Sequence, residues 1–143
     1  MLIDLFVILH FIGLAMGVGT GFAMFTLGFA TRHLAPPERA AFMLRATALS
    51  RMGSIGLLLL IVSGLGMMWQ RGVDVVFAWG GGLFHLKLTL VAVLLGLVGY
   101  MHALTARAKR EGGGPAMARL ATFGQLTLLV GIAIVVLAVL AFR

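Results

Sequence analysis

Four long apolar segments, separated by short polar connections, make up most of this chain. The segments run over residues 2–30, 49–69, 83–106 and 120–142. A helix needs about 20 apolar residues to cross a bilayer, and each segment meets that length. Lipid offers backbone groups no hydrogen-bond partner, so each segment is expected to be a helix. The pattern predicts an all-α fold: an integral membrane four-helix bundle that forms a single transmembrane domain over residues 1–143.

The connections carry signals of their own. In the first, two prolines and a glutamate at residues 36–38 predict a short helix leading into the second span. Trp69 precedes the second connection, residues 70–82, and Trp79 lies within it; both suit the membrane interface. We expect a loop there. In the third, residues 112–115 read Gly-Gly-Gly-Pro and predict a helix terminator and turn.

Composition supports the membrane assignment and excludes several classes of protein. Hydrophobic residues make up 62% of the chain and charged residues 10%, whereas a soluble domain has about 25% charged residues. There is no cysteine, which excludes disulfides, thiolate metal sites, iron–sulfur clusters and covalently attached haem. The sequence also shows no Ser-His-Asp arrangement, phosphate-binding loop or paired carboxylates. It therefore contains no recognisable catalytic residues for hydrolysis or phosphoryl transfer.

The net charge of +7 is unevenly distributed. Eight of the eleven basic residues lie in or beside the first and third connections: Arg32, Arg39, Arg45, Arg51, Arg107, Lys109, Arg110 and Arg119. This alternation is the positive-inside pattern of a membrane protein rather than a nucleic-acid surface. It predicts a multi-pass protein of the bacterial inner (cytoplasmic) membrane, with both basic connections in the cytoplasm and both termini on the periplasmic side.

Two histidines stand out because ionisable groups inside a span are costly. His10 lies about two turns into the first span, and His85 about one turn into the third, at the same side of the membrane. At about 100° per residue, each histidine heads a stripe of small residues. The stripes, with one neighbouring glycine, are Gly13, Gly17, Gly21 and Gly28 on the first span, and Ala92, Gly96 and Ala103 on the third.

Two interpretations of the stripes remain open. Gly13, Gly17 and Gly21 form a small-residue face of the kind on which membrane helices pack. Alternatively, a flat macrocycle lies between the two helices, because haem iron can be held by facing histidines with little bulk beside the ring. The second interpretation predicts haem b as the cofactor, with His10 and His85 as iron ligands.

The remaining polar and sulfur-bearing residues are less specific. Lys87 either extends to the interface or pairs with an anion such as a porphyrin propionate or a substrate carboxylate. His33 is expected to be a solvated connection residue. His102 lies about 100° around the helix from His85, so a second haem between His33 and His102 lacks support from helical phase. The nine methionines form no repeat and are interpreted as apolar filler rather than copper ligands.

Two stretches resemble a known family. Residues 9–13 (LHFIG) and 83–88 (LFHLKL) resemble the HemJ-type membrane protoporphyrinogen oxidases, which are four-helix proteins of similar size that bind haem b. The resemblance implies oxidation of protoporphyrinogen IX, with His10 as a haem or catalytic histidine, His85 as its counterpart and Lys87 as the catalytic lysine. A related group, the CopD-like copper-resistance membrane proteins, shares the early histidine.

Three functions follow from these observations. The first is a haem b redox protein, an oxidoreductase of the protoporphyrinogen oxidase type or one that exchanges electrons with a quinone. The second is a non-catalytic accessory subunit of a larger membrane complex. The third is a copper-handling, CopD-like membrane protein. The expected partners are the lipid bilayer, a tetrapyrrole or quinone, and a second copy or a larger complex, with no nucleic acid.

Overall fold

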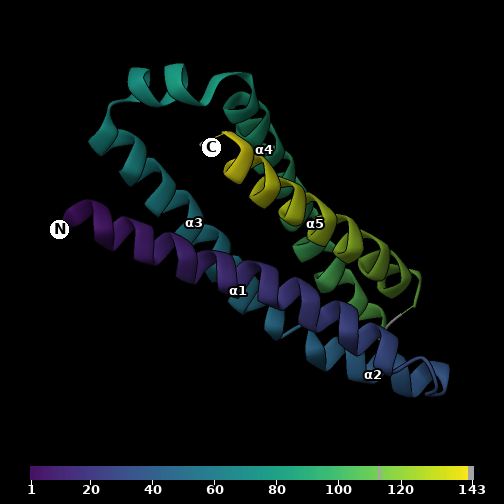
Figure 1. The fold of residues 1–143 in the computed structure, drawn as a ribbon. Coiled ribbons are helices and arrows are strands. Elements are labelled where there is room, and N and C mark those ends of the chain that lie inside the picture. The colour runs from purple at the N-terminus through teal and green to yellow at the C-terminus, as the bar shows by residue number, and fades with distance from the viewer. Residues whose placement is uncertain (113, 142–143) are drawn as a thin grey trace.

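The computed structural model describes residues 1–112 and 114–141, and within these residues every regular element is a helix (Figure 1). The helices are α1 (Leu2–Ala30), α2 (Pro36–Ala46), α3 (Leu49–Arg71), α4 (Val73–Glu111) and α5 (Gly114–Ala141). The predicted all-α class is therefore confirmed. Two residues that the sequence analysis assigned, Gly113 of the third turn and Phe142 of the last span, lie outside the described residues.

Four helical stretches of the described chain are long and apolar enough to cross a membrane: α1, α2 together with α3, α4, and α5. Many large apolar side chains on these helices face outward, including Phe11, Phe22, Leu58 and Leu129. In water such a surface would be costly, whereas in lipid it needs no cover. The protein is a multi-pass membrane protein built as a four-helix bundle.

The bundle consists of two helix pairs. α1 packs along α3, α4 packs along α5, and the pairs meet mainly where α1 faces α5. In Figure 1 the pairs converge at the end that holds α2 and diverge towards the end that holds the N-terminus. We call these the basic end, after the arginines of the two connections there, and the kink end, after the bend in α4 described below.

Glycines allow α1 and α3 to approach closely. A Cβ added at Gly56 of α3 would lie 2.7 Å from the carbonyl oxygen of Gly13 and 2.7 Å from the backbone nitrogen of Gly17. A Cβ at Gly13 would meet the Gly56 carbonyl oxygen at 2.7 Å. Small residues at such crossings bring backbones into van der Waals contact. Gly13 therefore lies in a helix-packing contact, as the first interpretation of its stripe requires.

This contact gives a prediction for stability. Gly56→Ala is expected to lower the free energy of unfolding by about 1–3 kcal/mol, because the added methyl group overpacks a backbone contact. Gly99→Ala is the matched control, since a Cβ there meets no atom within 4 Å; it should be neutral or slightly stabilising. Circular dichroism during denaturation in detergent measures both. Equal midpoints for the two variants would show that the α1–α3 contact is not close.

The second connection differs from its prediction. Residues 73–80 are helical rather than a loop, and α4 bends at Gly81, whose φ of 53° and ψ of −150° are not helical. Glycine tolerates this φ because it has no Cβ to clash. Figure 1 shows the first part of α4 running across the kink end before the helix turns into the bundle. The side chain of Trp79 within this segment is exposed, as is that of Trp69 near the end of α3.

The basic end is held by local contacts. The predicted short helix is confirmed as α2, and the guanidinium of Arg39 donates a hydrogen bond from Nη2 to the Gly28 carbonyl oxygen, 3.2 Å away. A cation at the C-terminal end of α1 also complements the helix dipole. Between α4 and α5, a small cluster of buried residues forms the most tightly packed part of this end: Leu104, Ala108, Ala116 and Leu120.

Candidate functional site: a groove between the helix pairs

The two helix pairs enclose a large, mainly apolar groove of about 1360 Å³. Its lining includes residues from all the described helices, from Met67 and Met68 near the kink end to Pro36 and Met117 at the basic end. A groove of this size exceeds the usual range of small-molecule pockets, about 300–1,000 Å³. Six of the candidate site and stripe residues from the sequence line it: His10, Gly17, Gly21, Gly28, Lys87 and His102.

His10 is held by a serine of the neighbouring helix. Its Nδ1 lies 2.9 Å from Oγ of Ser63 on α3, and Ser63 is fully buried. The Ser63 hydroxyl also lies in position to donate to the Leu59 carbonyl oxygen. A hydroxyl has a single proton, so we assign that proton to the carbonyl and the Nδ1–H to His10. The lone pair on Nε2 is then left available to a ligand in the groove.

Gly64, the residue after Ser63 on α3, leaves room for the His10 ring. A Cβ added at Gly64 would lie 3.6 Å from Cε1 of His10, which is ordinary contact and leaves no space for a longer side chain. Thus α3 supplies both the hydrogen-bond acceptor and the gap that the imidazole occupies. The His10–Ser63 contact thus joins α1 to α3.

His102 has the same arrangement towards the basic end. Its Nε2 lies 2.8 Å from Oγ of Ser54 on α3, and Ser54 donates to the Ser50 carbonyl oxygen at 2.9 Å. By the same proton count, Nε2 carries the hydrogen and Nδ1 keeps its lone pair. As helical phase predicts, His102 and His85 lie on different faces of α4. No site at His102 was expected from the sequence. It is the His102 face that lines the groove.

His85 has a different environment. Its Nδ1–H donates to the Gly81 carbonyl oxygen at 2.9 Å, and its ring lies 4.9 Å from that of Phe77, centroid to centroid. His85 therefore sits at the α4 bend, exposed, and it is absent from the groove lining together with Ala92 and Gly96. The structure does not bring His10 and His85 together on one cavity, because the face of α4 that lines the groove is roughly opposite to His85.

The inward face of α4 at this level carries Lys87, near Phe84, Leu88 and Val91. The Lys87 Nζ lies 5.9 Å from the centroid of the Phe84 ring, and its charge acts electrostatically on His10. Three arginines also line the groove, Arg32 and Arg39 at the basic end and Arg71 at the kink end. Within the described residues the lining contains no Asp or Glu, so the groove has a positive potential.

The gathering of methionines along the groove was not predicted from the sequence. Six of the nine methionines line it: Met24, Met43, Met67, Met68, Met101 and Met117. They come from five helices, so no spacing along the chain could reveal that they share one cavity. One of them is already engaged, because the Thr127 hydroxyl donates to the Met101 sulfur at 3.3 Å.

The groove holds two kinds of soft or borderline donor, imidazoles and thioethers. Among the described residues, no three His, Cys, Asp or Glu side chains are grouped so that they could hold a metal ion. Thioethers suit soft ions such as Cu(I).

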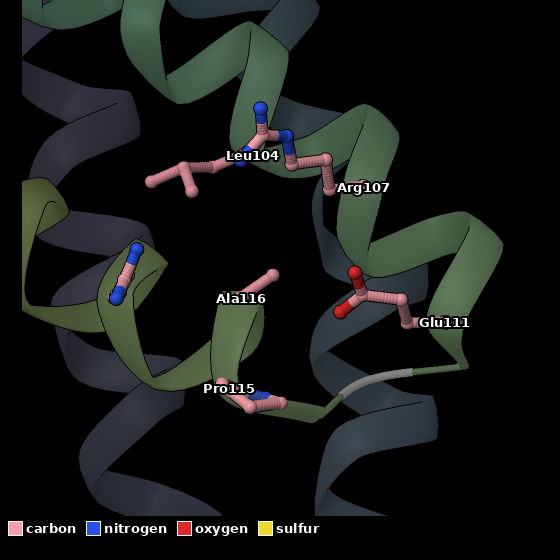
Figure 2. A pocket seen from close by; sticks show the side chains of 6 residues that line it. Leu104, Arg107, Glu111, Pro115 and Ala116 are labelled. Atoms are coloured by element: carbon pink, nitrogen blue, oxygen red, sulfur yellow. The ribbon is translucent and has the colours of Figure 1, made fainter.

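A second, smaller cavity of about 160 Å³ lies at the turn between α4 and α5. Figure 2 shows Arg107 and Glu111 on α4 beside Pro115 and Ala116 at the start of α5. The cavity has an acidic side chain among its two arginines and none of the candidate histidines. The chemistry available to this protein is thus concentrated in the large groove.

Comparison with known proteins adds a family. The model of the copper resistance protein D (CopD) family matches residues 43–141. No curated protein matches the chain, and no solved structure matches it. The match covers Ser54, Ser63, Lys87 and His102 but begins after α1 and His10. Of the two resemblances seen in the sequence, the comparison supports the CopD-like one and does not extend to the protoporphyrinogen oxidases. With the match covering more than two thirds of its residues, the chain belongs to the CopD family of membrane proteins.

Proposed function

We propose that this protein handles copper in the membrane, binding Cu(I) as cargo in the groove with His10 as a ligand. The observation that carries the proposal is the His10 imidazole: its Nδ1 lies 2.9 Å from Oγ of Ser63, and the residue lines a groove that six methionines also line. The description of the matched family, copper resistance, agrees with this chemistry.

The ligand types suit Cu(I) for a physical reason. Thioether and imidazole groups are uncharged donors that bind a soft ion without a buried carboxylate. Ligating histidines almost always donate their other ring N–H to a neighbouring group, which fixes the ring and the tautomer. Ser63 performs that role for His10. With the Nδ1–H directed to Ser63, Nε2 is the ring nitrogen that would bind Cu(I).

The positive lining bears on affinity. Lys87 and His10 line the same groove, so the lysine ammonium would repel a cation bound at His10, and the described lining contains no acidic residue to offset it. Such a site binds Cu(I) less tightly than the same ligands would in a neutral groove. Weak binding suits an ion in transit, which must leave as readily as it enters.

The experiment is a competition titration of the detergent-purified protein with Cu(I), without oxygen and with a chromogenic Cu(I) chelator. We expect the wild type to withdraw Cu(I) from the chelator and His10→Ala to bind at least tenfold more weakly at its tightest site. His33→Ala is the matched control, because His33 is exposed and does not line the groove. A wild type that takes no Cu(I), or a His10→Ala variant that binds as the wild type does, would refute the proposal.

A second candidate is a tetrapyrrole such as haem b, favoured by the positive charge of the apolar groove. His10 would hold the iron through Nε2, and Lys87 would pair with a propionate carboxylate. The group would supply one-electron redox chemistry, for oxidation of protoporphyrinogen IX or exchange with a quinone. The pairing of His10 with His85 does not fit, because His85 lies outside the groove.

Optical spectra separate the two candidates. Purified protein expressed with haem supplied would show a Soret band, and sharp α and β bands after dithionite reduction, if haem is bound. The bands should disappear in His10→Ala and persist in His85→Ala. A colourless wild type that binds Cu(I) would eliminate the tetrapyrrole candidate.

A further inference from the structure

We infer that the groove holds a second Cu(I) site at His102, separate from the site at His10 and closer to the basic end. The inference rests on the proposed function, since it takes Cu(I) as the cargo, but it adds a site that the His10 site does not require.

The evidence is a repeated arrangement. In both places a histidine lines the groove and one ring nitrogen lies within 2.9 Å of a serine hydroxyl on α3. In both places the serine proton is directed to a carbonyl oxygen one turn back, on Leu59 or Ser50. Each imidazole is thereby left with one unprotonated nitrogen, Nε2 of His10 and Nδ1 of His102.

The two sites are too far apart to share one ion. Ser54 and Ser63 are nine residues apart on α3, which corresponds to about 13–14 Å along the helix axis. A single Cu(I) ion bonds to nitrogen and sulfur at roughly 2.0–2.3 Å, as comparable metal–ligand bonds do. An ion at His10 therefore leaves the free nitrogen of His102 unused.

Sulfur ligands are available on the side of the groove nearest each histidine. Met67 and Met68 lie in the last part of α3, towards the kink end, on the same side as His10. Met24, Met43 and Met117 lie towards the basic end, on the same side as His102, and Met101 precedes His102 on α4. An ion moving from one site to the other would exchange Cu–N and Cu–S bonds without any change of oxidation state, and each imidazole would keep its serine-bound proton.

The test is the number of ions bound. Purified protein is dialysed to saturation against Ag(I), a redox-inert substitute for Cu(I), and bound metal is measured by atomic absorption. We expect two equivalents for the wild type, one for His10→Ala, one for His102→Ala and none for the double variant. His102→Met should retain two equivalents, because a thioether replaces the imidazole as a soft donor, and it guards against loss through misfolding.

The possible failures differ from one another. One equivalent in the wild type, lost in His10→Ala and kept in His102→Ala, would overturn the second site and leave the proposed function standing. One equivalent lost in either single variant would mean a single shared site and would also overturn the inference. No Ag(I) bound to a folded wild type would overturn the proposed function and, with it, the second site.

Discussion

Ser63→Ala is expected to weaken Cu(I) binding at His10 by about ten- to a hundredfold, although Ser63 is not a ligand of the ion in the proposed site. Removing the hydroxyl leaves the His10 Nδ1–H without its acceptor at 2.9 Å, so the ring loses both its orientation and its fixed tautomer. Losses of this size are typical when the hydrogen-bond partner of a metal-binding histidine is removed. The Cu(I) competition titration measures the change.

The matched control is Ser54→Ala, which removes the equivalent hydroxyl from His102. It should leave the His10 affinity unchanged and weaken only the second equivalent. Circular dichroism melting checks that neither loss comes from unfolding, because a buried donor left unpaired costs about 1–3 kcal/mol in stability. If Ser63→Ala and Ser54→Ala weaken both sites equally, the serines act on the bundle rather than on individual histidines.

Lys87→Gln is expected to strengthen Cu(I) binding at His10 by about tenfold. Two unit charges about 10 Å apart repel by about 1.7 kcal/mol at an effective dielectric constant of about 20, and about 1.4 kcal/mol corresponds to a factor of ten in affinity. Glutamine keeps most of the side-chain length and removes the charge. The same competition titration reports the shift.

Lys87→Arg is the control, because it keeps the positive charge and should bind Cu(I) as the wild type does. The direction of the change for Lys87→Gln also distinguishes the two candidate functions. A ligand with carboxylates would lose its counter-charge and bind more weakly, whereas a cation would bind more tightly. Unchanged Cu(I) affinity in Lys87→Gln would show that Lys87 directs its charge away from the His10 site.

The placement of His85 shows where sequence reasoning met its limit. Helical phase correctly separates His85 from His102 on α4, but it does not say which of the two faces points inward. That depends on how α4 packs against α5 and on the bend at Gly81. Both are tertiary features. The His85 Nδ1–H donates a hydrogen bond to the Gly81 carbonyl oxygen. The iron site between His10 and His85 stays a prediction without support from the geometry.

The methionines illustrate a different limit. Local periodicity identifies residues that share a face of one helix, but the six methionines of the groove come from five helices. Their convergence depends on how the five helices pack around one groove. The absence of a repeat along the chain therefore carried no information about their proximity in space.

The length of the apolar runs and local propensity alone predicted the class of protein, the number of spans and a short helix beginning at residues 36–38. The same sequence also indicated His10 and Lys87 as ionisable residues within a membrane. The contacts between these residues follow from the tertiary structure. Two serines of α3 lie against His10 and His102, whereas His85 hydrogen-bonds to Gly81 at the α4 bend. The reason is physical, because contacts between helices depend on their relative rotation and separation, which packing between helices sets and no single segment encodes.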